Sequence, residues 1–233
     1  MKLLRPIAAI ALSALALAAQ AADHVYLLDN SYADQNGGPS LVDDGGTLDA
    51  TGYSFAPNQG LTLSNVLGSV YTIDFQSSFS TVTGFRKLVD FKDRTSDTGL
   101  YNLNTALNFY NITTGNPGAF APDVLARVTI TRDASDLFTG YVNGVQQIQF
   151  VDGSFLATFS AGAQIARFFE DDLAVGGEAS AGRVEYIRTF DTALSAAQVA
   201  ALGVPSAVPE PQTYALMLVG LLLTAGVARA RKR

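Results

Sequence analysis

The feature that most limits what this chain can fold into is the dipeptide Asn143-Gly144, which separates two segments rich in β-forming residues. The flanking segments are Leu137–Val142 and Val145–Val151. Asn and Gly both tolerate the positive φ angles of a type I′ turn, so the pair predicts a two-residue β-hairpin. We therefore expect antiparallel sheet in this part of the chain.

Short segments with the period of a half-buried strand recur on both sides of this hairpin. Residues 69–75 alternate, and residues 85–91 are expected to alternate strictly, with one face formed by Phe85, Lys87, Val89 and Phe91. The stretch 29–49, rich in Asp, Gly, Asn and Ser, is expected to be a loop. Further strands are expected at 25–28, 100–103, 107–110, 127–131, 164–169 and 183–190.

One short helix is expected after the last strand. Ser195 can cap its start, Gln198 stands three residues later as the capping-box partner, and Gly203 ends it just after Leu202. Many short strands without an interior helix predict an all-β fold, a two-sheet antiparallel jelly-roll sandwich. With no cysteine in the chain, the core alone must hold this fold together.

Both ends of the chain have the composition of targeting segments. Residues 1–21 combine Lys2 and Arg5 with an Ala/Leu run and a small-residue cleavage site, which predicts a secretory signal peptide. At the other end, a linker (204–208) leads to the uncharged segment 212–228 and the basic end 229–233. The 17 residues of the uncharged segment 212–228 are at the lower limit for a single transmembrane helix. The basic end is expected to stay cytoplasmic, which places the preceding domain outside.

The tail 209–233 resembles a PEP-CTERM sorting signal, in which a short motif precedes an apolar span and a basic end. The motif here is Pro209-Glu210-Pro211. Such signals occur in Gram-negative bacteria that produce exopolysaccharide, and the resemblance implies an exosortase-type enzyme as processing partner. It also implies an inner-membrane intermediate, followed by the cell surface or extracellular matrix.

Charge argues against nucleic acid as a partner of the exported part. Six of the 15 basic residues, but only one of the 21 acidic residues, lie in the two targeting segments. Nine basic and 20 acidic residues remain, a formal charge of −11. A domain this acidic repels a phosphate backbone.

The expected domain, residues 22–203, is similar to concanavalin A-like domains of the laminin G or pentraxin type. The motifs that carry the similarity are Tyr-Val-Asn-Gly-Val at 141–145, Ile-Ala-Arg-Phe-Phe-Glu-Asp-Asp at 165–172, Ala-Gly-Arg-Val-Glu-Tyr-Ile-Arg-Thr-Phe-Asp at 181–191 and Ala-Leu-Ser at 193–195. Domains of this kind include lectins, glycosidases, adhesion modules and spacers, so the resemblance implies a sandwich without choosing its function.

No catalytic arrangement is expected, and the chain is not predicted to be an enzyme. Glucanases of this fold carry their carboxylates in a Glu-x-Asp-x-x-Glu pattern on one strand, and residues 22–208 have no such pattern. The single histidine, His24, has no partner suggested by spacing and is interpreted as a surface or strand-edge residue.

A calcium site is the most specific chemical hypothesis. Asp171 and Asp172 precede Gly176-Gly177 and Glu178, and closely spaced carboxylates with loop carbonyls suit calcium, the only cofactor considered. The alternative is a solvated acidic turn, in which Asp171 or Asp172 binds local backbone amides.

A second candidate is the polar loop 91–101, with Arg94, Asp97 and Tyr101 as ligand-binding residues. The alternative is an ordinary hairpin loop in which Arg94 pairs with Asp93 or Asp97. Two functions stay open: a lectin-like surface or matrix protein that binds extracellular polysaccharide, and a purely structural biofilm component without a ligand. A glycoside hydrolase has less support.

Overall fold

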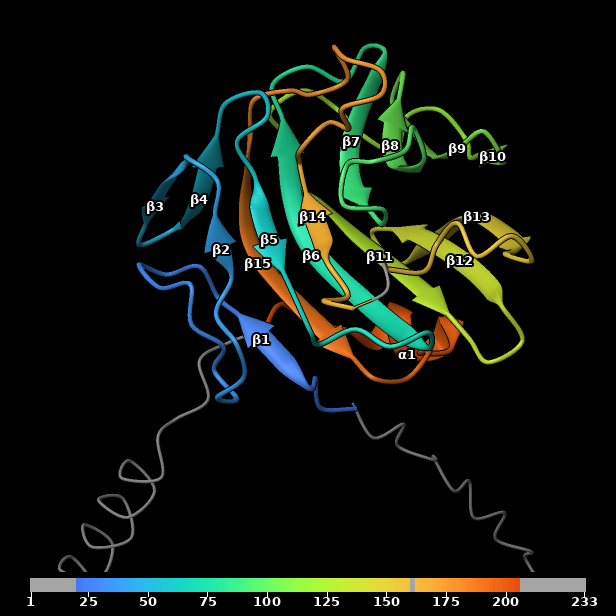
Figure 1. Ribbon diagram of the computed structural model, residues 1–233, viewed down its shortest axis with the longest axis horizontal. Helices are drawn as coiled ribbons and strands as arrows, with labels where there is room; N and C mark the ends of the chain where they lie inside the picture. The colour runs from blue at the N-terminus through green and yellow to red at the C-terminus, as the bar shows by residue number, and fades with distance from the viewer. Residues whose placement is uncertain (1–19, 160–161, 206–233) are drawn as a thin grey trace, which may run out of the picture.

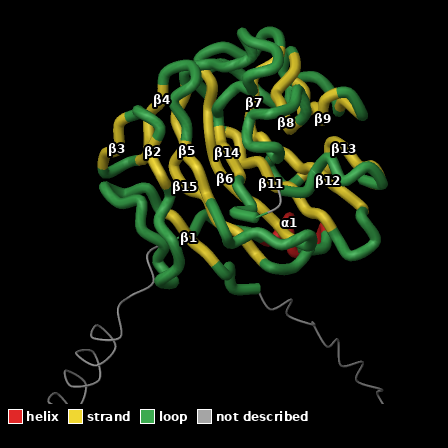
Figure 2. Tube along the Cα trace, in the orientation of Figure 1, coloured by secondary structure: helices red, strands yellow, loops and turns green. Residues whose placement is uncertain are grey.

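Two antiparallel β-sheets packed face to face make up the fold (Figure 1). The computed structural model describes residues 20–159 and 162–205. Most of the expected signal peptide, the end of the linker and the whole sorting tail lie outside these residues. Apart from one short helix, the described chain is strand and loop (Figure 2), which confirms the predicted all-β sandwich.

The first sheet has the strand order β13-β12-β11-β6-β15-β4-β3, with β1 also paired to β15. Its strands are β1 (His24–Tyr26), β3 (Thr47–Asp49), β4 (Gly52–Phe55), β6 (Tyr71–Phe79), β11 (Ala126–Arg132), β12 (Leu137–Val142), β13 (Val145–Val151) and β15 (Gly182–Phe190). The second sheet has the order β10-β9-β8-β7-β14-β5-β2. Its strands are β2 (Val42–Asp43), β5 (Leu61–Leu63), β7 (Phe85–Asp90), β8 (Gly99–Leu103), β9 (Ala106–Tyr110), β10 (Thr113–Thr114) and β14 (Ala166–Phe168).

Aromatic side chains fill the space between the sheets. Phe75 of β6 lies at the centre, and its ring meets those of Phe168 and Phe169 edge to face. Phe55 stacks on Phe169 with ring centroids 4.5 Å apart. All four side chains are buried, and burial of rings of this size dominates the stability of such a core.

The predicted hairpin and helix are both confirmed. Asn143 and Gly144 have φ angles of 51° and 79°, and they join β12 directly to β13. Helix α1 (Ala196–Ala201) has the capping box between Ser195 and Gln198. It packs through Val199 in a small cluster separate from the main core.

Several predicted strand boundaries were wrong because positive φ angles end strands early. Leu28 has φ 53°, and β1 already ends at Tyr26. Gln164 and Phe169 have φ 46° and 66°, which leaves residues 165–168 between them, and the last three of these form β14. The expected loop 29–49 contains the short strands β2 and β3.

Strand β7 does not alternate strictly, because a β-bulge interrupts its pairing with β8 between Lys87 and Val89. Val89 and Phe91 enter the core, whereas Lys87 lies over the ring of Tyr101 instead of sharing their face. A bulge inserts one residue and re-aims the side chains around it. The predicted common face of these residues was therefore wrong at Lys87.

The short α1 is the one helix among the described residues. No helix in this part of the chain is long and apolar enough to cross a membrane. The predicted transmembrane segment 212–228 is outside the part of the chain that the structure describes.

Candidate functional site

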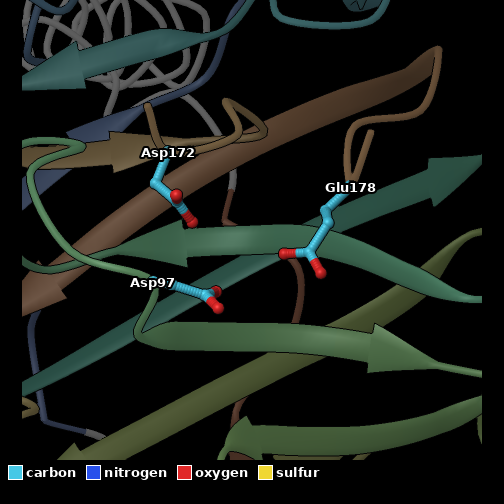
Figure 3. A group of neighbouring side chains, drawn as sticks. All are labelled: Asp97, Asp172 and Glu178. Atoms are coloured by element: carbon cyan, nitrogen blue, oxygen red, sulfur yellow. The ribbon is translucent and has the colours of Figure 1, made fainter. Parts of the chain in front are cut away.

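Two loops meet beside the second sheet and bring together residues that the sequence placed in separate sites. Asp97 precedes β8, while Asp172 and Glu178 belong to the long connection from β14 to β15. One carboxylate oxygen of each lies within 4.8 Å of the others, and Figure 3 shows the three carboxyl groups gathered around a common space. We call Asp97, Asp172 and Glu178 the acidic cluster.

A buried lysine supplies the positive charge at this cluster. Lys87 Nζ donates to Asp172 Oδ2 at 2.9 Å and to the Thr98 carbonyl at 3.1 Å. It also lies 3.7 Å from Asp90 Oδ2 and 4.2 Å from the centre of the Tyr101 ring. The sequence analysis missed Lys87 as a site residue, because the bulge that aims it here leaves no mark in the alternating pattern.

Backbone amides occupy most of the remaining acceptor positions of the two adjacent aspartates. Asp171 accepts from the amides of Asp172 and Glu178 at 3.0 and 2.7 Å. Asp172 Oδ1 accepts from the amides of Ala174 and Val175, each at 2.8 Å. These are the local amide bonds of the alternative interpretation, although both aspartates are buried rather than solvated.

Burial and local partners set the protonation of the cluster. Burial opposes ionisation of Asp172, yet the hydrogen bonds from Lys87 and from backbone amides lower its pKa. Burial raises the pKa of Glu178, and the nearby carboxylates of Asp97 and Asp171 add to this rise. Glu178 Oε2 is enclosed and has no hydrogen-bond partner among the described residues.

The three predicted ligand-binding residues lie in different surroundings. Arg94 reaches across to the β14–β15 connection, where it donates to the Asp171 carbonyl at 2.6 Å and lies 3.2 Å from Glu170 Oε2. The expected local pairing with Asp93 or Asp97 is thus replaced by a long-range one. Tyr101 is fully buried, with its hydroxyl 3.3 Å from Asp97 Oδ1, so its ring faces the acidic cluster and Lys87 rather than solvent.

Glu170 forms a second buried charge next to the cluster. Its Oε2 lies 3.2 Å from both Arg94 and Arg167, and its side chain has no exposed surface. Burial raises the pKa of Glu170 to about 7, and the neighbouring Asp44 adds to the rise despite the two guanidinium groups. This carboxyl group therefore holds its proton to higher pH than an exposed glutamate does.

His24 has a partner that the sequence did not reveal. Its Nδ1 lies 2.7 Å from Asp34 Oδ2, and Asp34 also accepts from the amides of Val25, Asn36 and Gly38. The same amides lower the pKa of Asp34 although burial opposes this. This pair ties the loop after β1 back to the strand, which is a structural role.

No family model matches the chain, and no curated protein matches it in sequence. The chain is similar in structure to domain 4 of AbnA, an extracellular arabinanase from Geobacillus stearothermophilus that was solved with arabinotriose. The TM-score is 0.59 at 14% identity, over 77% of this chain and 97% of that domain.

In two further similar structures, the match covers only part of the solved chain. Trypanosoma rangeli sialidase gives a TM-score of 0.59 at 11% identity, over 76% of this chain and 31% of the sialidase. The ligand-binding domain of botulinum neurotoxin serotype D, solved with N-acetylneuraminic acid, gives 0.55 at 11% identity, over 77% of this chain and 50% of that one. The chain thus spans about half or less of these two structures. At such identities the similarity shows the fold alone, an antiparallel β-sandwich.

Proposed function

We propose that this chain is an exported, non-enzymatic surface or matrix protein whose sandwich binds glycan. The observation that carries the proposal is the match to almost the whole of an arabinanase domain solved with arabinotriose. The arabinanase match covers almost a complete domain, whereas the matches to the sialidase and the toxin cover only parts of those chains. Export is proposed from the sequences of residues 1–21 and 209–233.

The state of the carboxylates supports a binding role over hydrolysis. A retaining glycosidase needs two free carboxyl groups about 5 to 5.5 Å apart, one of them ready to donate a proton. In the acidic cluster, Asp172 is bound by Lys87 and by two amides. The nearby Glu170, whose pKa is raised, is enclosed between Arg94 and Arg167. Neither Asp172 nor Glu170 is therefore free to act, and because residues 22–208 also lack the Glu-x-Asp-x-x-Glu pattern, we propose no catalytic residue.

We propose that calcium would compete with the Lys87 ammonium group for the carboxylates of the acidic cluster. The acidic cluster offers three carboxylate oxygens, and Asp97 takes the place of the predicted ligand Asp171, whose oxygens accept backbone amides. An ion there would have to displace the Lys87 ammonium group from Asp172. The proposal thus predicts that calcium binding, measured by titration calorimetry, strengthens when Lys87 is replaced by methionine.

Sorting is proposed to depend on Pro209-Glu210-Pro211 and the tail that follows. An exosortase-type enzyme would process the tail and leave the protein at the cell surface or in the matrix. Deleting 209–233 should change localisation in the producing bacterium while leaving the sandwich folded. A deleted form that is retained and cleaved like the wild type would refute this assignment.

Binding of the folded protein to the producing organism's own extracellular polysaccharide tests the proposal, once with calcium and once with a chelator. Saturable binding is the expected result, and sensitivity to the chelator would support the calcium component. A folded protein that binds under neither condition would favour the alternative, a structural biofilm component without a ligand.

A further inference from the structure

A groove of about 360 Å³ lies between the hairpin strands β12 and β13 and the N-terminal end of α1. Tyr141 and Thr139 line it from β12, Gln146 and Gln149 from β13, and Gln198 from α1. Its volume falls within the range of roughly 300 to 1,000 Å³ that is common for small-molecule sites. None of these residues belongs to the acidic cluster on the second sheet.

A β-bulge gives the groove its two adjacent amide side chains. Gly140 pairs with Ile148, but the next residue, Tyr141, pairs with Gln146, so Gln147 is an extra residue. Ile148 enters the core while Gln146 and Gln149 are exposed. In a regular strand, residues three apart point to opposite faces; the bulge brings both amides to one wall of the groove.

The lining offers hydrogen bonds together with an aromatic surface. Gln149 Nε2 donates to Thr139 Oγ1 at 3.0 Å, which holds that amide along the wall. Tyr141 is 95% buried against α1, so its position is fixed by packing. One amide held by a hydrogen bond, a second exposed amide and neighbouring hydroxyls beside the edge of an aromatic ring suit a ligand that presents hydroxyl groups around an apolar body.

The groove is nearly free of charge. No lysine or arginine lines it, and its single carboxylate is Asp133. That carboxylate already accepts from the amides of Ser135 and Leu137 and from the Ser135 hydroxyl. An anionic ligand would find no cation here, and a cationic ligand would find a single carboxylate, whose Oδ1 accepts all three of these bonds.

We infer that this groove is a binding site for a short, uncharged saccharide segment. The inference rests on the proposed glycan-binding function and deepens it, since it names the site and the ligand class: neutral rather than uronate-containing or sulfated glycan. Recognition is by the amides of Gln146 and Gln149 at the edge of the Tyr141 ring, while the Gln198 amide oxygen is held by the cap at Ser195.

Equilibrium binding of the full chain in mild detergent to two immobilised probes, neutral arabinan and acidic polygalacturonate, tests the inference. The wild type should bind the neutral polysaccharide and not the acidic one. The double variant Gln146→Ala/Gln149→Ala should bind about 30-fold more weakly, since two lost hydrogen bonds of about 1 kcal/mol each correspond to such a factor.

A second variant blocks the groove without removing a hydrogen-bonding group. Ala196 is exposed in the first turn of α1 and lines the groove, so Ala196→Trp should reduce binding to a similar degree. Gln35→Ala, at an exposed glutamine in the loop after β1, is the matched control and should bind like the wild type. Only variants whose melting temperature equals that of the wild type are compared, so that weaker binding reflects the groove and not unfolding.

The outcomes separate the groove from the broader proposal. Wild-type binding that persists in both groove variants overturns the groove and leaves glycan binding in place. Asp97→Asn in the acidic cluster then shows whether that site carries it instead. Binding of polygalacturonate alone overturns the neutral-ligand inference. A wild type that binds no polysaccharide, its own included, overturns the proposed function and the inference together.

Discussion

The ammonium nitrogen of Lys87 lies 2.9 Å from Asp172 Oδ2, and both side chains are fully excluded from solvent. The two residues are 85 positions apart in the chain, so this pair joins β7 to the β14–β15 connection. Asp90 lies at the same ammonium group, at 3.7 Å. One lysine thus balances more than one buried carboxylate, and the local fold depends on its charge.

Replacing Lys87 by methionine should destabilise the protein by about 3 to 5 kcal/mol. The side chain keeps its volume but leaves Asp90 and Asp172 buried without a counter-ion, which is the costly way to break a buried pair. Urea unfolding followed by circular dichroism measures the loss. Added calcium should restore part of it if a divalent ion can replace the ammonium group.

Lys92→Met is the matched control for this experiment. Lys92 is the other lysine in the described residues, and it donates to the carbonyls of Phe155 and Thr158 instead of to a carboxylate. Its loss should cost about 1 to 2 kcal/mol and should not respond to calcium. Equal costs for the two variants would show that Lys87 carries no special electrostatic role.

A second buried network holds the end of the described domain. Asp74 accepts from Arg188 Nε at 2.9 Å and from Thr129 Oγ1 at 2.5 Å. Arg188 in turn donates to the carbonyl of Gly203. Asp74→Asn should therefore destabilise the fold by about 3 kcal/mol and increase hydrogen exchange after α1, where the predicted linker begins.

An exposed ion pair serves as the comparison for Asp74. Asp49 pairs with Arg183 at 2.9 Å, and more than half of its side chain is exposed. Asp49→Asn should leave the free energy of unfolding almost unchanged, because water screens such a pair. If Asp74→Asn cost no more than this, the arginine network would not be what holds the linker in place.

Glu170 predicts a pH dependence of stability. Burial raises its pKa to about 7, above the value of 4.5 for a free glutamate. Between these values the folded protein binds more protons than the unfolded chain, so stability falls as pH rises through this window. Glu170→Gln removes that loss. The difference in free energy of unfolding between the variant and the wild type should therefore shift by about 2 kcal/mol in favour of the variant when the pH is raised from 5 to 8.

Asp44 allows the cause to be tested separately. It adds to the raised pKa of Glu170, so Asp44→Asn should make the wild-type pH dependence shallower without removing it. A difference between Glu170→Gln and wild type that stays constant from pH 5 to pH 8 would show that Glu170 titrates normally.

Local sequence signals predicted the elements whose shape is set locally. Asn143-Gly144 fixes a turn through its own φ angles, and Ser195 with Gln198 fixes a helix start through two hydrogen bonds three residues apart. Alternation predicted the central strand β6 and, through many similar segments, the two-sheet sandwich. These features depend on neighbours in the chain, which a sequence shows directly.

Long-range pairings and bulges were not predictable in the same way. The bulge after Lys87 changes which face its side chain takes, although residues 85–91 look like a regular strand. Arg94 was expected to pair within its own loop but finds Glu170, 76 positions away. The acidic cluster joins residues from two predicted sites because the fold, rather than sequence spacing, brings the two loops together.

The Asn143-Gly144 turn between β12 and β13 also gives a stability prediction. Gly144 has φ 79°, and an added Cβ would lie 3.0 Å from Arg127 Nη2. Gly144→Ala should therefore lower the free energy of unfolding by about 1 to 2 kcal/mol. Gly153→Ala is the control, since its added Cβ meets no atom within 4 Å; it should be neutral or slightly stabilising. Melting temperatures that fall equally for both variants would mean that the turn does not demand glycine, and that the flanking strands alone set the register of β12 and β13.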